Sequence, residues 1–164
     1  MLITLNAVLN KEELAVASDL LSRGSFEDGK LSAGQEAVRV KNNLELSGQD
    51  DLITPLNNLV MGKLIQHPVY LAAALPLKIA SPYYAKYSQG MSYGYHIDDP
   101  VMGLAEQQYR SDIAITIFLN PPEDYDGGGL VIKTAFGEQL VKLNAGDGVM
   151  YPSSSTHQVA EVTR

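Results

Sequence analysis

Hydrophobic side chains in the N-terminal part of the chain recur at the spacing of an amphipathic helix. Between Leu14 and Leu21 the apolar positions fall mostly three or four residues apart, so they share one face of a helix. Asn10 precedes this segment and Glu13 follows Asn10 by three residues, which is the spacing of a capping box. The pattern therefore predicts a helix that begins at Lys11.

A second helix is predicted near residues 50–66. Leu52, Leu56 and Leu64 keep the helical spacing in this segment, and they would form a single apolar face. Pro55 fits such a helix only in its first turn, because proline lacks the backbone N–H that later turns require. Residues 23–34, between the two predicted helices, contain several turn-forming residues and are expected to form a loop.

After Pro76 the pattern changes to short runs of β-branched and aromatic residues, separated by turn signals. Strands are expected near residues 77–80, 83–88, 92–98, 112–119, 129–134, 138–143, 148–151 and 157–162. Many short strands at close spacing are typical of a sandwich, a barrel or a jelly roll. We therefore predict an α+β fold and one domain, residues 1–164. Residues 1–76 would be mainly helical support and residues 77–164 the β core.

Composition narrows the class of protein. The chain has 164 residues and a formal net charge of −7, which disfavours nucleic acid or an anionic membrane as the main partner. It contains no cysteine, which excludes a disulfide framework and thiolate metal sites. The N-terminus lacks the features of a signal peptide, and the longest apolar run is too short to span a bilayer. A cytoplasmic location is expected.

The stretch GYHIDDP, residues 94–100, contains the candidate chemistry. His96 and Asp98 are two residues apart in a predicted strand, so their side chains would project from the same face. Of the two other histidines, His157 lies in a late β run and could reach His96 from a neighbouring strand. His67 precedes a proline at the end of a helical pattern, which is a common surface setting.

Two imidazoles and one carboxylate on one face of a metal ion are typical of non-heme Fe(II) oxygenases. Zinc hydrolases can use the same residue types, although they usually keep a single open coordination position. A pair of the form H-x-D is weak when taken alone, because histidine and aspartate are common near strand ends. Spacing by itself thus leaves both alternatives and a purely structural role open.

Three longer stretches carry a family resemblance: YSQGMSYGYHIDDP (87–100), RSDIAITIFLNPPEDYDGGGLVI (110–132) and VKLNAGDGVMYPSSSTHQV (141–159). Their motifs occur in the order and at the spacing of the Fe(II)/2-oxoglutarate-dependent dioxygenases. In particular, the chain resembles the bacterial PKHD-type hydroxylases, which carry a prolyl/lysyl-hydroxylase-type domain. The segment VKNN (40–43) also resembles that branch, so the similarity covers nearly the whole chain.

The resemblance implies a double-stranded β-helix, or jelly-roll, core with the N-terminal helices packed outside. It also implies that His96, Asp98 and His157 bind Fe(II) and that Tyr87 contacts the co-substrate 2-oxoglutarate. The implied reaction hydroxylates a C–H bond of a small molecule or peptide with O₂ and releases succinate and CO₂. L-Ascorbate would serve as a reductant.

One departure from the family concerns the co-substrate. Relatives usually carry a basic residue about ten positions after the distal histidine, where a guanidinium can pair with the far carboxylate. Here seven residues follow His157, and Arg164 stands at a different spacing. We therefore expect a truncated C-terminal strand and a chain that is a fragment of a longer protein. A metal-binding jelly roll without oxygenase turnover, such as a sensor, is the alternative, followed by a cupin-like zinc or manganese isomerase or hydrolase.

Polar and aromatic residues near these motifs have plainer explanations. Arg110 and Asp112 are expected to form a structural ion pair more readily than to orient a substrate. Tyrosines cluster at positions 83, 84, 87, 93 and 95, and on strands such residues are most often packed. Asp99 is expected to face solvent, opposite Asp98.

Overall fold

The computed structural model describes residues 1–103 and 105–164. Within these residues the α-helices are α1 (Lys11–Arg23), α2 (Ile53–Leu64) and α3 (Pro68–Ala74). The strands are β1 (Ile3–Leu5), β2 (Phe26–Asp28), β3 (Lys41–Asn42), β4 (Leu44–Leu46), β5 (Ala85–Lys86), β6 (Ser92–His96), β7 (Val101–Met102), β8 (Tyr109–Arg110), β9 (Ile113–Ile117), β10 (Leu130–Thr134), β11 (Gly137–Val141), β12 (Gly148–Pro152) and β13 (His157–Val159). Short 3₁₀ turns occupy Gly29–Ser32, Ala37–Arg39, Ala105–Gln107 and Pro122–Asp124.

The first predicted helix is confirmed, and its start has the expected chemistry. The Glu13 backbone N–H donates to Asn10 Oδ1 at 3.0 Å, and the Asn10 N–H donates to Glu13 Oε2 at 2.9 Å. This reciprocal pair satisfies two N–H groups that the first turn of a helix leaves without partners. Arg23 lies in the last turn, where a cation interacts favourably with the helix dipole.

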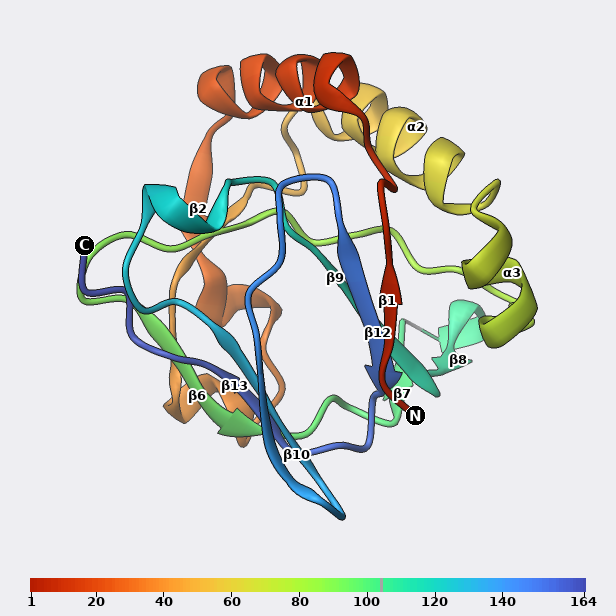
Figure 1. The fold of residues 1–164 in the computed structure, drawn as a ribbon, viewed down its shortest axis with the longest axis vertical. Coiled ribbons are helices and arrows are strands. Elements are labelled where there is room, and N and C mark those ends of the chain that lie inside the picture. The colour runs from red at the N-terminus through yellow and green to blue at the C-terminus, as the bar shows by residue number, and fades with distance from the viewer. Residues whose placement is uncertain (104) are drawn as a thin grey trace.

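The second predicted helix is also confirmed, as α2, with Leu56, Val60 and Leu64 on its buried face. The pattern did not predict α3. His67 caps this helix, since its Nδ1 accepts the Tyr70 N–H at 3.4 Å, and Pro68 occupies the first helical position, where its missing N–H is not needed. In Figure 1 the helices lie along one side of the strands, with α1 and α2 next to each other.

The strands form antiparallel sheets. A five-stranded sheet has the order β11-β10-β13-β6-β3, and a three-stranded sheet has the order β1-β12-β9. Two smaller sheets, β2-β4-β5 and β7-β8, complete the set. The fold is thus a mixture of helices and mostly antiparallel strands (Figure 1).

Six of the predicted strands are present, as β6 and β9 to β13. Strands β6, β9, β10 and β13 are shorter than predicted, β11 begins one residue earlier and ends two residues earlier, and β12 ends one residue later. The strand predicted at 77–80 is wrong, since these residues form no strand, and only Ala85–Lys86 of the predicted 83–88 are strand. Four strands within residues 1–76 were not predicted, and β2 lies in the segment expected to be a loop. They are two or three residues long, too short for a period-two pattern to emerge.

Apolar side chains between the helices and the sheets form the core. One cluster joins Leu9 and Ala17 to Leu56 and Val60 of α2, and another joins Leu5 of β1 to Met150 of β12. Leu5, Leu56 and Met150 are all 0% exposed. Burying a side chain of this size stabilises the folded state by about 1.5–3 kcal/mol. The core therefore fixes β12, and through β12 the loop that leads into β13.

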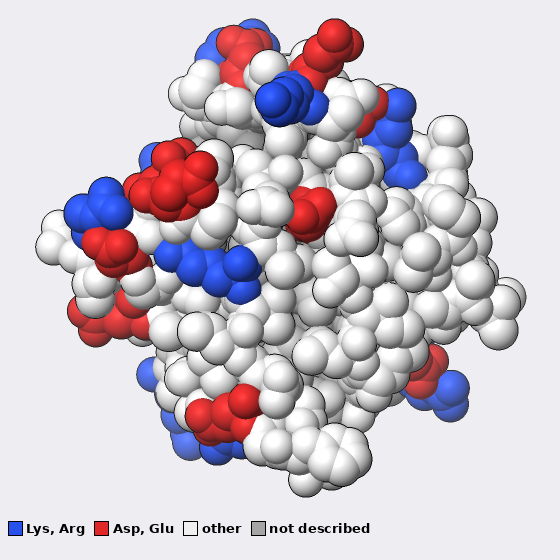
Figure 2. Space-filling view, viewed as in Figure 1, with Lys and Arg blue, Asp and Glu red and all other residues white. Residues whose placement is uncertain are grey.

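Charged residues are mixed on the surface. On the face seen in Figure 2, lysines and arginines lie beside aspartates and glutamates, and a large part of the face is uncharged. No helix among the described residues is both long enough and apolar enough to cross a membrane.

Candidate metal centre

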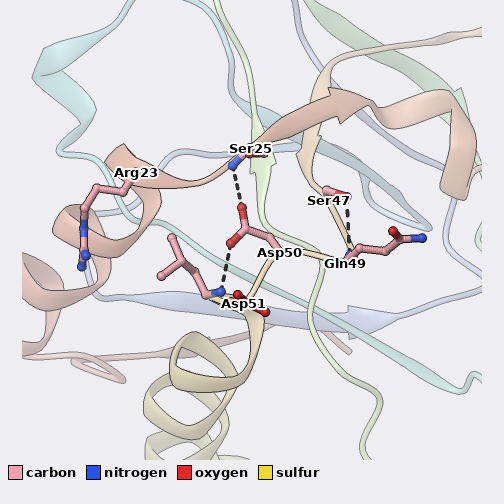
Figure 3. A pocket seen from close by; sticks show the side chains of 7 residues that line it. Arg23, Ser25, Ser47, Gln49, Asp50 and Asp51 are labelled. Atoms are coloured by element: carbon pink, nitrogen blue, oxygen red, sulfur yellow. Dashed lines mark hydrogen bonds between the residues drawn. The ribbon is translucent and has the colours of Figure 1, made fainter.

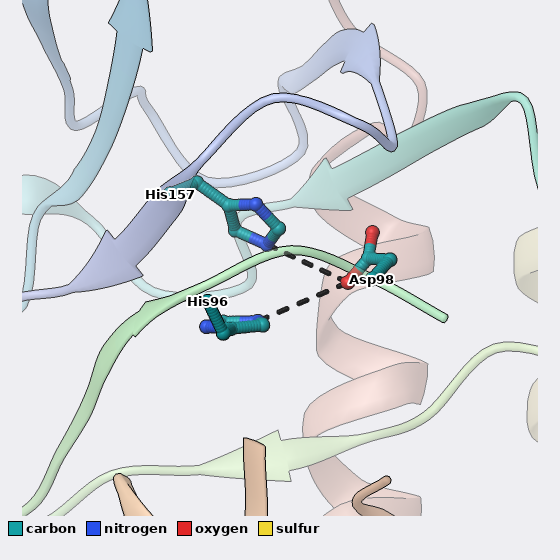
Figure 4. Close-up of side chains that lie close together, drawn as sticks. All are labelled: His96, Asp98 and His157. Carbon is teal, nitrogen blue, oxygen red and sulfur yellow. Dashed lines mark ion pairs between the residues drawn. The ribbon is translucent and has the colours of Figure 1, made fainter. Parts of the chain in front are cut away.

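Two neighbouring strands bring His96, Asp98 and His157 together. His96 is the last residue of β6, and it lies directly opposite His157, the first residue of β13. Asp98 lies two residues beyond the end of β6, where its backbone N–H donates to the Ser153 carbonyl at 3.3 Å. This bond joins the loop after β6 to the segment before β13 and helps to hold Asp98 beside both rings (Figure 4).

The distances between the three side chains leave room for a small cation. The Asp98 Oδ1 atom lies 3.8 Å from His96 Nε2 and 3.6 Å from His157 Nε2. Both separations exceed the length of a good N–H···O hydrogen bond. One potential ligand atom from each residue lies within 4.8 Å of the other two, which is the arrangement expected of ligands that share one ion.

Backbone carbonyls set the tautomers of both histidines. His96 Nδ1 lies 2.8 Å from the Gly94 carbonyl oxygen, and His157 Nδ1 lies 2.9 Å from the Ser155 carbonyl oxygen. A carbonyl can only accept, so Nδ1 carries the hydrogen in each ring and Nε2 keeps its lone pair. Two lone pairs and a carboxylate thus face one another, as in metal sites where the second ring nitrogen is held by an outer partner.

Burial tunes the charges of the centre. Burial is the main cause that lowers the pKa of His96 to about 4; nearby positive charge contributes in the same direction and the bond to the Gly94 carbonyl opposes the shift, so this imidazole is neutral near pH 7. Burial also raises the pKa of Asp98, although the charge of His157 opposes this shift. A bound cation would favour the ionised carboxylate and the neutral imidazole together.

A bulge in β6 places an aromatic ring on His96. The register between β13 and β6 shifts, because His157 pairs with His96 whereas Val159 pairs with Tyr93. The extra residue brings Tyr93 onto the same side as His96, and the two rings stack with centroids 3.6 Å apart and an angle of 11°. The ring of Tyr151 from β12 meets His157 edge-on at 5.1 Å. The imidazoles are therefore held by packing as well as by hydrogen bonds.

A buried ion pair lies behind Tyr93. Lys41 Nζ lies 2.6 Å from Glu45 Oε1 and 5.1 Å from the centroid of the Tyr93 ring. Ser32 Oγ accepts from Lys41 Nζ at 2.8 Å and donates to Glu45 Oε2 at 2.6 Å. The sequence placed Lys41 in a stretch of family resemblance, VKNN (40–43), and gave it no role. The available signal was a polar residue at every second position of KNNLE (41–45), a pattern that indicates one polar face of an extended segment.

Tyr87 lies in the interior near this group, and burial raises the pKa of its hydroxyl. The negative charge of the Glu45 carboxylate raises this pKa further. Its contact with a co-substrate stays a prediction.

The other residues considered for the site lie outside the cluster of His96, Asp98 and His157. His67 Nε2 lies 3.0 Å from the Asn6 carbonyl oxygen, and the ring caps α3. Arg164 forms an exposed ion pair with Asp126 at 2.6 Å. Arg110 and Asp112 form the expected ion pair, at 2.8 Å, and Asp99 is exposed as expected.

A second polar region, in front of α2, is lined by Arg23, Ser25, Ser47, Gln49, Asp50, Asp51 and Leu52 (Figure 3). The Asp50 carboxylate accepts the Ser25 N–H at 2.7 Å and the Leu52 N–H at 2.9 Å. These bonds lower the pKa of Asp50. The region is thus explained by the local backbone without a ligand.

Comparison with known proteins identifies the family. The model of the 2OG-Fe(II) oxygenase superfamily matches residues 82–164, which include all three residues of the cluster. The chain belongs to this superfamily. A PKHD-type hydroxylase of Thioalkalivibrio sulfidiphilus is 47% identical over 163 residues, which cover 99% of this chain and 73% of the relative. A PKHD-type hydroxylase of Hyphomonas neptunium is 41% identical over 169 residues, which cover 100% of this chain and 74% of the relative. The resemblance to PKHD-type hydroxylases is confirmed.

Solved structures of two prolyl hydroxylases share the fold. A prolyl-4-hydroxylase of Pseudomonas putida superposes with a TM-score of 0.68 at 20% identity, over 99% of this chain and 86% of that protein. A prolyl hydroxylase of Trichoplax adhaerens, in complex with a peptide of hypoxia inducible factor, superposes with a TM-score of 0.68 at 15% identity. The superposition covers 99% of this chain and 78% of that protein. At these identities the similarity concerns the arrangement of helices and strands.

Proposed function

We propose that this chain is an Fe(II)- and 2-oxoglutarate-dependent hydroxylase whose metal ligands are His96, Asp98 and His157. The observation that carries the proposal is the pair of Nε2 lone pairs that face the Asp98 carboxylate. Because each Nδ1–H is already bonded to a carbonyl, the rings have no tautomer in which both could donate to Asp98 while neutral. The three groups are therefore matched to a cation.

Three protein ligands leave several positions of a six-coordinate ion for co-substrate and O₂. The side chains of His96 and His157 are 7% and 6% exposed, whereas that of Asp98 is 29% exposed. Access to the ion would thus be from the Asp98 side. The rings of Tyr93 and Tyr151 cover the histidines and would keep water from them.

When bound, Fe(II) and 2-oxoglutarate supply the oxidation: O₂ and the 2-oxo acid yield succinate, CO₂ and one oxygen atom for insertion into a C–H bond. The chain holds the His96 imidazole neutral through burial, and it holds the orientation of both rings through the carbonyls of Gly94 and Ser155. The chain would also restrict access to the site, because the two histidines are almost fully buried beneath the rings of Tyr93 and Tyr151. Restricted access would hold the reactants in one orientation.

Further parts of the proposal concern the fold and the partners. We infer a jelly-roll core in which the five-stranded and three-stranded sheets face each other, with Tyr87 beside the co-substrate. The substrate is a peptide or a small molecule, ascorbate serves as the reductant, and the protein acts in the cytoplasm.

The test is anaerobic calorimetry with Fe(II), followed by measurement of succinate formation from 2-oxoglutarate under O₂. Metal binding together with 2-oxoglutarate turnover is the expected result. Metal binding without turnover would favour a sensor or an inactive module, and zinc after anaerobic purification would favour a hydrolase. His67→Ala provides the matched control, because His67 is the histidine outside the cluster and its removal should leave metal binding unchanged.

A further inference from the structure

A short strand, β3, lies beside the part of β6 that leads into the metal centre. Lys41 pairs with Tyr93 and Asn42 pairs with Ser92, so β3 flanks β6 on the side opposite β13. The strand has only two residues, and the stretch VKNN (40–43), which contains it, is not explained by the metal ligands. Two paired residues contribute few hydrogen bonds, so side chains must help to fix the position of β3.

Lys41 anchors β3 in the interior of the protein. Its side chain is 6% exposed, and that of its ion-pair partner Glu45, at 2.6 Å, is 10% exposed. Glu45 belongs to β4, so the pair joins two different sheets. Ser32 Oγ bonds both charges, at 2.8 Å and 2.6 Å. Because a buried ion pair is costly to separate, these three residues, here called the Lys41 unit, hold β3 against the β2-β4-β5 sheet.

The first contact from β3 to the metal centre is made by the ring of Tyr93. Lys41 Nζ lies over this ring, 5.1 Å from its centroid, which is within the range of about 6 Å over which a cation is attracted to an aromatic ring. The imidazole of His96 stacks on the same ring, with centroids 3.6 Å apart and an angle of 11°. A displacement of Lys41 would therefore release the ring on which His96 is packed.

The second contact is made by the backbone of Gly94. Its N–H donates to the Val40 carbonyl at 2.8 Å, and its own carbonyl accepts from His96 Nδ1 at 2.8 Å. A Cβ added at Gly94 would lie 2.9 Å from Val40 Cβ, so the two backbones are as close as glycine permits. A shift of β3 would thus change the direction of the carbonyl that orients the His96 ring.

We propose that the Lys41 unit positions His96 for metal binding, because it fixes β3 against β6. This inference rests on the proposed function above, and its residues act through Tyr93 and Gly94. A ligand side chain must be held within about 0.5 Å and 10–20° of its productive geometry. An ion pair with hydrogen bonds joins particular atoms, whereas an apolar contact of the same volume allows several arrangements, so the Lys41 unit contributes orientation as well as stability.

The experiment separates orientation from stability. The double variant Lys41→Met with Glu45→Leu leaves no buried charge unpaired and should keep most of the wild-type stability in urea. Its Mn(II) affinity, measured by anaerobic calorimetry, should nevertheless fall by about tenfold, the lower end of what the loss of an outer partner of a metal ligand costs. With Co(II) in place of Fe(II), the visible absorption spectrum should differ from wild type, since it depends on the arrangement of the ligands. Wild-type Mn(II) affinity in this variant would show a purely structural role and overturn the inference.

The outer face of β6 offers a matched control. Lys133 lies 4.0 Å from the centroid of the Tyr95 ring and pairs with Glu138 at 3.8 Å. Tyr95 is adjacent to His96 in β6, so it projects from the opposite face, and the side chains of Lys133 and Glu138 are 48% and 55% exposed. The double variant Lys133→Met with Glu138→Leu should therefore keep the wild-type Mn(II) affinity and Co(II) spectrum. An equal loss of affinity in both double variants would also overturn the inference.

A milder variant covers the case in which the double variant at Lys41 and Glu45 does not fold. Ser32→Ala removes only the hydroxyl that bonds both charges and should weaken Mn(II) binding by a smaller factor, whereas unchanged affinity would then overturn the inference. If wild type binds no Mn(II), the proposed function fails together with this inference. Equal Mn(II) binding by wild type and the Lys41–Glu45 double variant rejects the inference alone.

Discussion

Two aspartates of this chain lie among polar groups, and they differ in what faces their oxygens. Asp50 accepts two backbone N–H groups, at 2.7 and 2.9 Å, in the region in front of α2. Asp98 faces the Nε2 atoms of His96 and His157, at 3.8 and 3.6 Å. The first carboxylate is surrounded by hydrogen-bond donors and the second by lone pairs. An acidic residue in a polar region is therefore no indication of a metal site unless the atoms around it are acceptors as well.

The pKa shifts of Asp50 and Asp98 have opposite signs because their surroundings differ. Backbone hydrogen bonds from Ser25 and Leu52 favour the ionised form and lower the pKa of Asp50. Burial raises the pKa of Asp98 against the opposing charge of His157. Ionised Asp98 thus gains from a cation, whereas Asp50 is already satisfied by its own loop.

The largest expected effect is the loss of the metal centre. Asp98→Ala or His96→Ala should abolish 2-oxoglutarate-dependent succinate formation and reduce Mn(II) affinity by at least about 100-fold, since removing only a hydrogen-bond partner of a metal ligand already costs about 10- to 100-fold. Asp50→Ala should keep both properties. Activity assays and calorimetry on the three variants provide the check, and turnover that persists in both centre variants would remove the proposed site.

The next effect concerns the buried ion pair. Lys41→Met should lower the free energy of unfolding by about 3–5 kcal/mol, because Glu45 would keep an unpaired buried charge. The double variant Lys41→Met with Glu45→Leu should recover most of that loss, since it removes both charges. Urea denaturation measures both values. A double variant no more stable than the single one would show that the ion pair is not the cause.

A smaller effect is expected at Asp50. Asp50→Asn should lower the melting temperature by a few degrees at neutral pH, because the charge that the two N–H groups favour is lost. The folded-state pKa of Asp50 is lowered, so its contribution is present above the unfolded pKa of about 3.9 and is lost as the pH falls through the folded value. The melting curves of variant and wild type should therefore converge in acid. A difference that persists at low pH would contradict this explanation.

The smallest effect is expected for Tyr87→Phe, which removes one hydroxyl and little volume. If this hydroxyl bonds 2-oxoglutarate, affinity should fall by roughly tenfold, the value of a single hydrogen bond, whereas metal affinity should not change. Calorimetry with Mn(II) and 2-oxoglutarate separates the two quantities. Tyr95→Phe is the control, because the Tyr95 hydroxyl bonds Glu138 at the surface.

Local patterns predicted the elements whose causes are local. The capping box of α1 needs only Asn10 and Glu13, and the apolar face of α2 needs only its own spacing. Strands β6 and β9 to β12 are five residues long, which is enough for a local pattern to be recognised, whereas β13 forms only the first three residues of its predicted run. The strands of the first 76 residues depend on distant partners, as β1 does on β12, so a local pattern could not predict them.

The sequence by itself determined the composition of the candidate site: an H-x-D pair, one further histidine in a β run, and the motifs that carry the family resemblance. Tertiary structure decided how these residues meet. Asp98 lies beyond the end of β6, so its position depends on a bond to Ser153, and the bulge that stacks Tyr93 on His96 depends on pairing with β13. Residue type fixes which atoms can donate or accept, whereas only packing fixes which of them are left facing one another without a partner.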